Sequence, residues 1–520
     1  MQPLARQESR LSFLSWWSDS NPPGPTINLH AAAKPLARFL YHRQALQIIR
    51  KNRDSPLSTT TLEIYRGYFP WNFVSSLTKA AILRELAKRV GSSEAEARMV
   101  VESPLFPCVT QMLWSPDTHW QAQSSSYNLL GKLAQHESTA PAVLELKLCP
   151  QLVSLLHDRD SRVIWRATYT LAQIALWPDG AHAVIEANAI DHILELLGSP
   201  SPDIQGLTCM LVRNLAAHKS TAPAILKLKL CPQLVSLLHN QDSSVISHAT
   251  SALSRIALCP DGARGIIKAN NIDHILELLE SPNPEVQRLN CMLVGNLAAH
   301  ESTAPAILKL KLCPQLVSLL RNQDSSVISN ATYALSQIAR RLDSANDVIE
   351  ANVIDHILEL LGSPSPDIQR LSCKLVGNLA AHESIAPIIL ELKPCPRLVS
   401  FLHDRDSSVI SNATYALSHI SRWLDGAHDV IETNVIDHIL ELLKLPNSEI
   451  QRWIYVLVGN LAAHKSTAPT ILELKLCPQL VSLLCDQDSE VTWRATYTLS
   501  QIALWPDGAQ AQMFEDQLAC

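Results

Sequence analysis

The chain of 520 residues carries a net charge of −6 and only 15 glycines, whereas an average glycine content of roughly 7 % would give about 36. The acidic balance excludes a globally basic surface for nucleic acid, and the lack of any 18-residue apolar run excludes direct membrane insertion. Because 47 % of the residues are hydrophobic, the chain can build a packed core, and its few glycines argue against a turn-rich all-β fold.

Residues 1–33 are predicted to form a flexible N-terminal arm. The arm contains Trp16 and Trp17, which we expect either to pack onto the first helices or to act as a docking peptide. Its start lacks the charged-then-apolar pattern of a signal peptide, and Gln2 stands where N-myristoylation requires glycine. We therefore expect a cytoplasmic protein whose 12 cysteines are reduced thiols.

Residues 34–106 are predicted to form a helical N-terminal region. Apolar periodicity and local capping residues favour helices over 35–51, 74–90 and 94–101, outside any regular repeat. A repeat array needs an end with a polar outer face. We therefore expect this region to cap the array that follows it.

Three motifs recur in a single register along the rest of the chain. The motif Asn-Leu-Ala-Ala-His begins at Asn214, Asn296, Asn378 and Asn460, and the motifs Cys-Pro and Ile-Asp-His-Ile return with the same spacing. The apolar positions of these last two motifs coincide when one is shifted by half that spacing, so the true repeat is half as long and alternates between two types. A period of about 41 residues in a helical chain is typical of HEAT and armadillo arrays.

Each repeat is predicted to contain three helices. In the repeat that begins at Cys149, Pro150 opens a short apolar helix, and a long helix follows over 163–175 after the N-cap pair Asp160 and Ser161. A third helix is expected over 181–187, ended by Asn188 in the left-handed conformation. The array is predicted over 107–511 and a tail over 512–520. Because no capping repeat is evident, we expect the C-terminal end either to self-associate or to be closed by the tail.

The repeat pattern resembles the armadillo repeat. The resemblance rests on Pro-x-Leu-Val-x-Leu-Leu followed by Val-x-x-x-Ala-x-x-x-Leu-x-x-Ile-Ala, and it covers roughly ten repeats. It implies an all-α, armadillo-type right-handed solenoid that acts as a non-enzymatic scaffold or adaptor and binds extended peptide segments of partner proteins in a groove. The family also includes fungal vacuolar adaptors and nuclear import adaptors for basic cargo. The alternatives are therefore a membrane-associated adaptor and an import adaptor, reaching the vacuole or nucleus through a partner.

In armadillo proteins the long helix lines the groove, and the resemblance places two series of side chains there. The aromatic series comprises Tyr169, Tyr333, Tyr415 and Tyr497, and the amide series comprises Gln173, Asn214, Asn296, Gln337, Asn378, Asn460 and Gln501. An asparagine amide can hold the backbone of an extended peptide with its donor and acceptor together. Alternatively, these amides bond neighbouring turns within the stack. Import adaptors also need Trp-x-x-x-Asn, which no repeat contains.

Three arginines on the same helices are candidate anchors for acidic or phosphorylated partners. Arg288, Arg370 and Arg452 each lie three residues after an acidic residue. The alternative interpretation pairs each arginine with that neighbouring acid on a solvated face, where such ion pairs are common and weak.

No residue pattern indicates an enzyme, a metal site or a cofactor. The recurrent His192, His274, His356 and His438 are two repeats apart, hence separated by ~20 Å, and cannot share a metal. No Cys-x-x-Cys pair or phosphate-binding glycine loop occurs. We expect the eight cysteines at repeat positions to be small buried apolar residues, and His136 and its four copies to bond carbonyl groups after the long helix.

Overall fold

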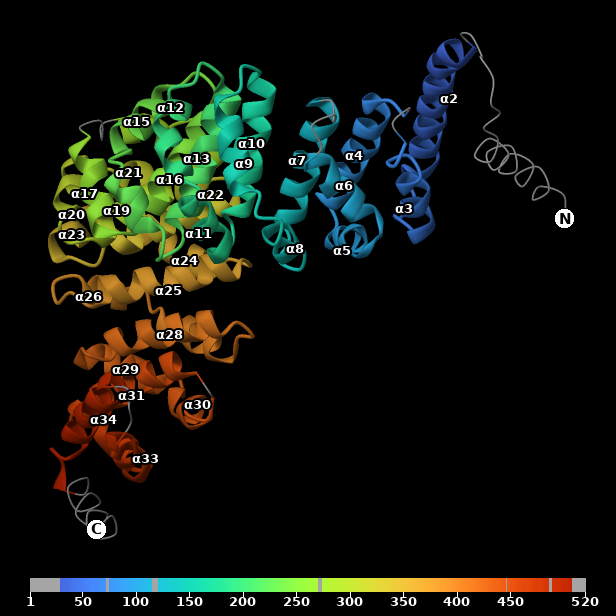
Figure 1. Ribbon diagram of the computed structural model, residues 1–520. Helices are drawn as coiled ribbons and strands as arrows, with labels where there is room; N and C mark the ends of the chain where they lie inside the picture. Colours follow the sequence, from blue (N-terminus) through green and yellow to red (C-terminus); the bar gives the residue numbers. More distant parts are fainter. Residues whose placement is uncertain are drawn as a thin grey trace. The chain divides into compact units, whose positions relative to one another are not determined.

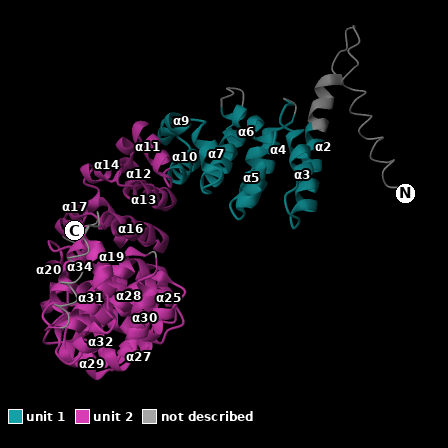
Figure 2. Cartoon of the chain, turned by 90° about the horizontal axis from the view of Figure 1, so that it is seen from below, with its two compact units in different colours: residues 1–174 teal, residues 175–520 magenta. Residues whose placement is uncertain are grey.

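The computed structural model describes residues 29–71, 74–114, 120–269, 274–445, 447–485 and 489–506, and every regular element in these ranges is a helix (Figure 1). Two compact units divide the chain, Met1–Ile174 and Ala175–Cys520 (Figure 2). The predicted all-α solenoid is confirmed. The predictions for Trp16 and Trp17 and for the tail 512–520 lie outside the described residues, and the predicted domain boundaries stay predictions.

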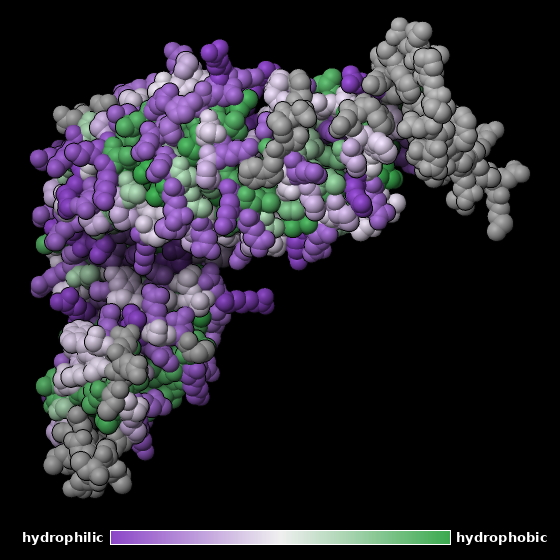
Figure 3. Space-filling model, in the orientation of Figure 1, coloured by the Kyte–Doolittle hydropathy of each residue, from purple (hydrophilic) through white to green (hydrophobic). Residues whose placement is uncertain are grey.

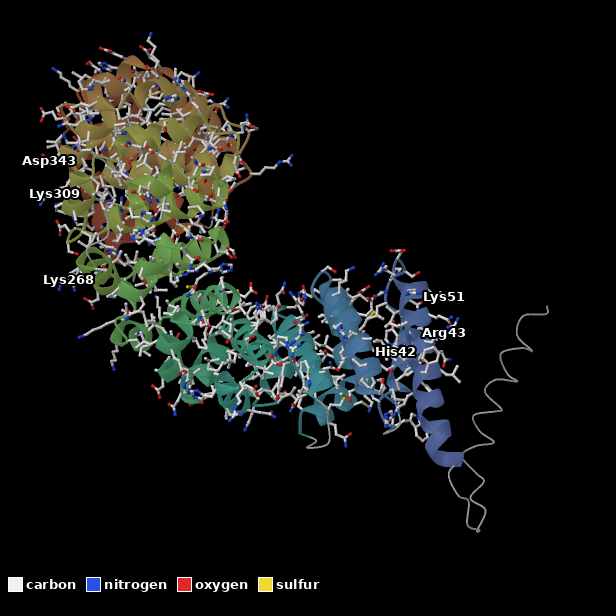
Figure 4. All side chains as sticks on the ribbon, turned by 90° about the horizontal axis from the view of Figure 1, so that it is seen from above. His42, Arg43, Lys51, Lys268, Lys309 and Asp343 are labelled. Carbon is white, nitrogen blue, oxygen red and sulfur yellow. The ribbon has the colours of Figure 1, made fainter. Side chains whose placement is uncertain are left out.

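The first compact unit begins with helices of irregular spacing. They are α2 (Leu29–Asn52), α3 (Thr59–Arg66), α4 (Ser76–Val90), α5 (Glu94–Glu102) and α6 (Leu105–Trp114). The helix α7 (Trp120–Ala134) follows them as a long helix of the regular array, one repeat length before the next long helix. The sequence analysis predicted α2, α4 and α5 but did not single out α3 and α6. The Nδ1 atom of His42 lies 3.1 Å from the Thr78 hydroxyl, which ties α2 to α4, and Figure 4 shows His42, Arg43 and Lys51 along α2.

The long helices recur once in each repeat, with the predicted spacing. After α7 they are α10 (Ser161–Ile174), α13 (Pro202–Ala216), α16 (Ser243–Ile256), α19 (Pro284–Ala299), α22 (Ser325–Ile338), α25 (Pro366–Ala380), α28 (Ser407–Ile420), α31 (Ser448–Ala463) and α34 (Ser489–Ile502). Within the second compact unit each long helix from α13 to α34 packs against the next one, and α4, α7 and α10 do so in the first. The predicted period is therefore the period of the stack.

The short helices that precede the long ones alternate between two forms. In one form an α-helix that starts at Cys-Pro continues as a 3₁₀ turn: α9 and η1 (Cys149–Ser154, Leu155–His157), α15 and η3 (Cys231–Ser236, Leu237–His239), α21 and η4 (Cys313–Ser318, Leu319–Arg321), α27 and η5 (Cys395–Ser400, Phe401–His403), α33 and η6 (Cys477–Ser482, Leu483–Cys485). The other form comprises η2 and α12 (Ala189–His192, Ile193–Leu197), α18 (His274–Leu279), α24 (Ile354–Leu361) and α30 (Val435–Leu442).

A third helix follows each long one. These helices are α8 (Ala140–Leu144), α11 (Pro178–Glu186), α14 (Ala222–Lys227), α17 (Pro260–Lys268), α20 (Ala304–Lys309), α23 (Leu342–Glu350), α26 (Ala386–Glu391), α29 (Leu424–Glu432) and α32 (Ala468–Leu472). Figure 4 shows Lys268, Lys309 and Asp343 of α17, α20 and α23 along one edge of the second compact unit. The helix α11 begins at Pro178 and not at residue 181, where its start was predicted. Proline is accepted in the first turn because the N–H that it lacks would have no partner within the helix there.

The core consists of apolar side chains from all three helix types. Leu253, Leu293 and Leu335 on successive long helices have no exposed surface. The eight recurrent cysteines are buried as predicted, and none of them forms a disulfide with another described residue. Burial raises the pKa of the Cys149 thiol to about 11. On the face shown in Figure 3, hydrophilic residues cover most of the described surface. Burial of apolar area therefore holds the repeats together.

The ends of the helices follow the predicted capping chemistry, with one addition. Asp242, Asp324 and Asp406 accept N-cap hydrogen bonds at the starts of α16, α22 and α28. The left-handed position predicted for asparagine recurs from repeat to repeat and is filled alternately by lysine and asparagine. The residues with positive φ are Lys147, Asn188, Lys229, Lys311, Asn352, Lys393, Asn434 and Lys475. The lysines were missed because a left-handed lysine is uncommon.

Candidate functional site

Three successive long helices are joined through one asparagine side chain. Asn296 on α19 donates from Nδ2 to the Ser254 carbonyl of α16 across 2.8 Å, and its Oδ1 accepts from the Tyr333 hydroxyl of α22 across 2.8 Å. Only 5 % of Asn296 is exposed. The amide predicted either to hold a peptide or to bond the stack is therefore bonded within the stack, and one N–H of its NH₂ group stays unused there.

The same arrangement recurs in the following repeats of the second compact unit. Asn378 bonds the Ser336 carbonyl at 2.6 Å and the Tyr415 hydroxyl at 2.5 Å. Asn460 bonds the Ser418 carbonyl at 2.6 Å and accepts from Tyr497 at 2.8 Å. We call each such set of carbonyl, asparagine and tyrosine an Asn–Tyr bridge.

A glycine makes room for the tyrosine ring of each Asn–Tyr bridge. Gly295 directly precedes Asn296, and a Cβ atom on it would lie 2.5 Å from Cε1 of Tyr333. Gly377 and Gly459 stand in the same relation to their tyrosines, at 2.6 and 2.9 Å. The few glycines of the chain are therefore partly reserved for close contact between long helices.

One repeat lacks both members of the glycine–tyrosine pair. Arg213 precedes Asn214 where the other repeats of the same type have glycine, and Ser251 of the next long helix stands where they have tyrosine. Both residues line an open cavity of about 860 Å³. Because serine has no ring, the space that Tyr333 fills in its own repeat stays open here. We call this cavity the α16–α25 cavity, after the long helices that line it together with Arg213 of α13.

Long helices α13 to α25 supply the walls of the α16–α25 cavity. The polar and charged residues that line it are Arg213, Ser244, Ser247, His248, Ser251, Ser254, Arg255, Glu285, Arg288, Asn296, Ser329, Asn330, Tyr333, Asp367 and Arg370. Four of the predicted site residues, Arg288, Asn296, Tyr333 and Arg370, meet there. Four arginines face two acids, so the cavity carries an excess of positive charge.

Two of the four arginines are already neutralised. Arg288 forms a two-pronged pair with Glu285, at 2.6 and 2.8 Å, and Arg370 lies 3.4 Å from Asp367. Arg213 and Arg255 are exposed and have no ion-pair partner among the described residues. Partial burial and then the charges of Arg255 and Arg288 lower the pKa of Arg213. This crowding of positive charge favours an anionic ligand.

The third predicted arginine has a different partner from the one expected. Arg452 lies 3.5 Å from Glu490 of the next repeat, and Glu490 also pairs with Arg494 at 2.6 Å. Sequence reasoning considered only Glu449, three residues before Arg452, because acids of other repeats become neighbours only after the helices stack.

The remaining predicted site residues lie outside the α16–α25 cavity. Tyr169 stacks on Trp165, with 5.5 Å between the ring centres. Its buried hydroxyl has no hydrogen-bond partner among the described residues, because Lys132 occupies the asparagine position. Asn214, Gln173 and Gln337 are buried. The Gln501 amide lies 3.4 Å from the Ser500 hydroxyl.

The recurrent histidines of the Ala-His loop bond carbonyl groups, but these carbonyls end the preceding long helix and not, as expected, the histidine's own long helix. The Nε2 atoms lie 2.6–3.1 Å from the carbonyl oxygens at the end of the preceding long helix. The pairs are His136–Val90, His218–Ala175, His300–Ala257, His382–Ala339 and His464–Ser421. These histidines therefore tie consecutive repeats together.

Sequence reasoning did not single out Arg213, Ser251 and Arg255. The available signal was a departure from the repeat: the position that holds glycine in the other repeats of the same type holds arginine at 213. Since the partner position lies on the next long helix, the two changes are related only when consecutive long helices are laid side by side.

None of the helices in the described residues combines the length and apolar character needed to cross a membrane.

Comparisons with known proteins agree with this architecture. The model of the armadillo/beta-catenin-like repeat matches residues 221–258, 303–340 and 345–381. Junction plakoglobin of Sus scrofa is 22 % identical over 449 residues, which cover 83 % of this chain and 58 % of that protein. Importin subunit alpha-3 of Arabidopsis thaliana is 25 % identical over 308 residues, which cover 57 % of this chain and 49 % of that protein.

Two further similarities complete the comparison. Vacuolar protein 8 of Schizosaccharomyces pombe is 23 % identical over 263 residues, covering 48 % of each chain. A crystal structure of an engineered protein superposes with a TM-score of 0.61 at 26 % identity and covers 76 % of this chain and 97 % of that one. The chain thus spans about half to three-fifths of the length of these curated relatives. The periodic helical stack and the matched residues show that the chain contains armadillo repeats and has the fold of an armadillo-type α-solenoid.

Proposed function

We propose that this protein is a non-enzymatic scaffold or adaptor that binds an extended acidic segment of a partner protein in the α16–α25 cavity. The observation that carries the proposal is the pair Arg213 and Arg255, which are exposed in the cavity and lack ion-pair partners among the described residues. Carboxylate or phosphate groups of a ligand would supply the missing negative charge. The similarity to junction plakoglobin and importin subunit alpha-3 supports a binding role of this kind.

The predicted site residues take separate roles in this proposal. Arg288 and Arg370 would exchange their present acids for those of the ligand or hold them alongside it. Tyr333 offers a ring face, and Asn296 contributes its unused N–H. Specificity would arise from arginine rather than from the amide series, because the amides of Asn296, Asn378 and Asn460 are already bonded between repeats.

The cavity gives less support to the two predicted alternatives, an import adaptor and a membrane-associated adaptor. A basic cargo peptide would meet four arginines, so like-charge repulsion opposes an import adaptor that uses this site. A membrane-associated adaptor would need an anchor or a partner, and no described residue points to either. We propose a cytoplasmic location, supported by the buried repeat cysteines, none of which forms a disulfide with another described residue.

Binding of a labelled peptide tests the proposal. An extended peptide with alternating glutamate and apolar residues is titrated with the full chain and followed by fluorescence anisotropy, next to a phosphoserine peptide and a lysine peptide. We expect the two acidic peptides to bind, and Arg213→Ala and Arg255→Ala to weaken binding by about tenfold each. Arg264→Ala removes the same charge from α17 outside the cavity and serves as the control. Equal losses in all three variants would refute the assignment.

Self-association is a second proposal with its own observation. Trp493 of α34 and Leu504, two residues beyond the end of that helix, expose 62 % and 63 % of their surface, and Leu484 of η6 exposes 39 %. Apolar side chains of this size are usually covered. Light scattering after size exclusion should show a dimer that Trp493→Ser abolishes, and a monomer at high concentration would reject it.

A further inference from the structure

Two histidines and a glutamate from successive repeats converge at the short helices of the second compact unit. His403 ends η5, while His438 and Glu441 lie one turn apart on α30. One ligand atom from each of these side chains lies within 4.8 Å of the other two, and the two imidazole rings meet edge to face at 4.2 Å. Sequence reasoning compared each recurrent histidine only with its own copies and so missed His403 of the preceding repeat, which stacking makes a neighbour of His438.

The ligand atoms in this cluster are not engaged by other groups. The structure shows no hydrogen bond or ion pair for His403, His438 or Glu441 with any described residue. The equivalent set four repeats earlier differs. There Nε2 of His274 lies 3.0 Å from the Leu238 carbonyl, and its Nδ1 lies 2.6 Å from Glu277. In the later copy, by contrast, both imidazoles keep nitrogen atoms for an external ligand.

The copy midway between these two provides an internal comparison. His356 and Glu359 occupy the positions of His438 and Glu441, but Arg321 stands where the first histidine would be. A guanidinium cannot ligate a metal, so this copy lacks one ligand. The three-residue set therefore occurs in three of the four equivalent copies, which begin at His157, His239 and His403, and is incomplete in the copy with Arg321.

We propose that His403, His438 and Glu441 bind a Zn²⁺ ion that clips η5 to α30. Two imidazoles and one carboxylate form a common zinc ligand set, which leaves the remaining position to water. Tetrahedral zinc with bonds of about 2.0–2.1 Å places its ligand atoms about 3.4 Å apart. His403 and Glu441 are exposed and can close the remaining distance by side-chain rotation. Zinc would thus brace the junction between two repeats.

Metal titration of the full, reduced chain tests the proposal. Zn²⁺ is titrated in competition with a chromophoric chelator, and Co²⁺ is used as a spectroscopic probe. We expect visible d–d bands without a thiolate-to-cobalt charge-transfer band, which separates this site from the cysteines. His403→Gln and His438→Gln should each remove one equivalent of binding or weaken it by at least about tenfold. Unchanged binding, or cobalt spectra dominated by thiolate ligation, would overturn the proposal.

Two further variants sharpen the result. His182→Gln removes an exposed histidine that lies 3.3 Å from Glu186 without a second histidine, and it should leave zinc binding unchanged. Arg321→His completes the incomplete copy and should add one equivalent, because His356 and Glu359 are already in place. A folded Arg321→His protein without extra binding would count against the proposal. Zinc should also raise the Tm of the parent but not that of His403→Gln.

Discussion

The Tyr333 hydroxyl donates a 2.8 Å hydrogen bond to Oδ1 of Asn296, across two long helices, in the space that Gly295 leaves open. Asn296 in turn donates to the Ser254 carbonyl. The buried amide of Asn296 therefore connects three successive long helices, and the neighbouring Gly295 leaves room for the Tyr333 ring. Where the glycine and tyrosine are replaced, at Arg213 and Ser251, the stack opens into a cavity.

Asn378→Ala should lower the free energy of unfolding by about 2 kcal/mol, because the Ser336 carbonyl and the Tyr415 hydroxyl both lose their partner. Urea denaturation followed by circular dichroism measures this. The control is Asn412→Ala, whose amide donates only to the Ser408 carbonyl of its own helix. If Asn378→Ala lowers the free energy of unfolding no more than the control does, the Asn–Tyr bridge does not stabilise the contact between repeats. That result would favour the alternative interpretation, in which the asparagines hold a peptide.

Gly377→Ala should destabilise the array by about 1–3 kcal/mol, since the new Cβ would lie 2.6 Å from Cε1 of Tyr415. Gly198→Ala, whose Cβ would meet ordinary contacts at 3.4 Å or more, should be close to neutral. The double variant Gly377→Ala/Tyr415→Ser should cost less than the sum of its two single changes. Additive effects in thermal unfolding would contradict the proposed steric coupling.

Lys311→Gly should stabilise the protein by about 0.5–1 kcal/mol, because Lys311 holds φ at 49°, a conformation that glycine adopts without steric cost. Lys309→Gly, in the last turn of α20, should instead destabilise by about 0.5–1 kcal/mol. Chemical denaturation of both variants measures these changes in the free energy of unfolding. A loss of stability in Lys311→Gly would show that the lysine side chain makes a compensating contribution.

The stability of the second compact unit should fall in acid through His419. Burial first, then the charges of Arg422, Arg494 and His382, lower the pKa of His419 from 6.5 to about 4. Between these two pH values His419 is protonated in the unfolded chain but neutral in the folded chain. The free energy of unfolding therefore rises with pH in that window and reaches its full value above about pH 6.5.

The difference amounts to roughly 3 kcal/mol between pH 7 and pH 4. His419→Gln should remove this component, so the stability gap between parent and variant should shrink or reverse as the pH falls. Urea midpoints measured from pH 7 to pH 4 test it, with His182→Gln as the exposed control. A parent and variant with parallel pH profiles would show that His419 titrates normally when folded.

Local chemistry was readable from the sequence alone. The repeat period, the Asp N-caps at Asp242 and its copies, the left-handed Asn188 and the buried cysteines all depend on residues within one repeat, and repetition amplified each signal.

The relations between repeats were decided only by the tertiary structure. The sequence named Asn296, Arg452 and His438 as recurrent polar positions, yet their partners Tyr333, Glu490 and His403 lie in the neighbouring repeats. A hydrogen bond, ion pair or metal site depends on distances of a few ångströms, and those arise only when neighbouring helices pack. Periodicity determines that the repeats stack; side-chain shape at each interface, such as Gly295 against Tyr333 or Arg213 against Ser251, decides whether the interface closes or binds a ligand.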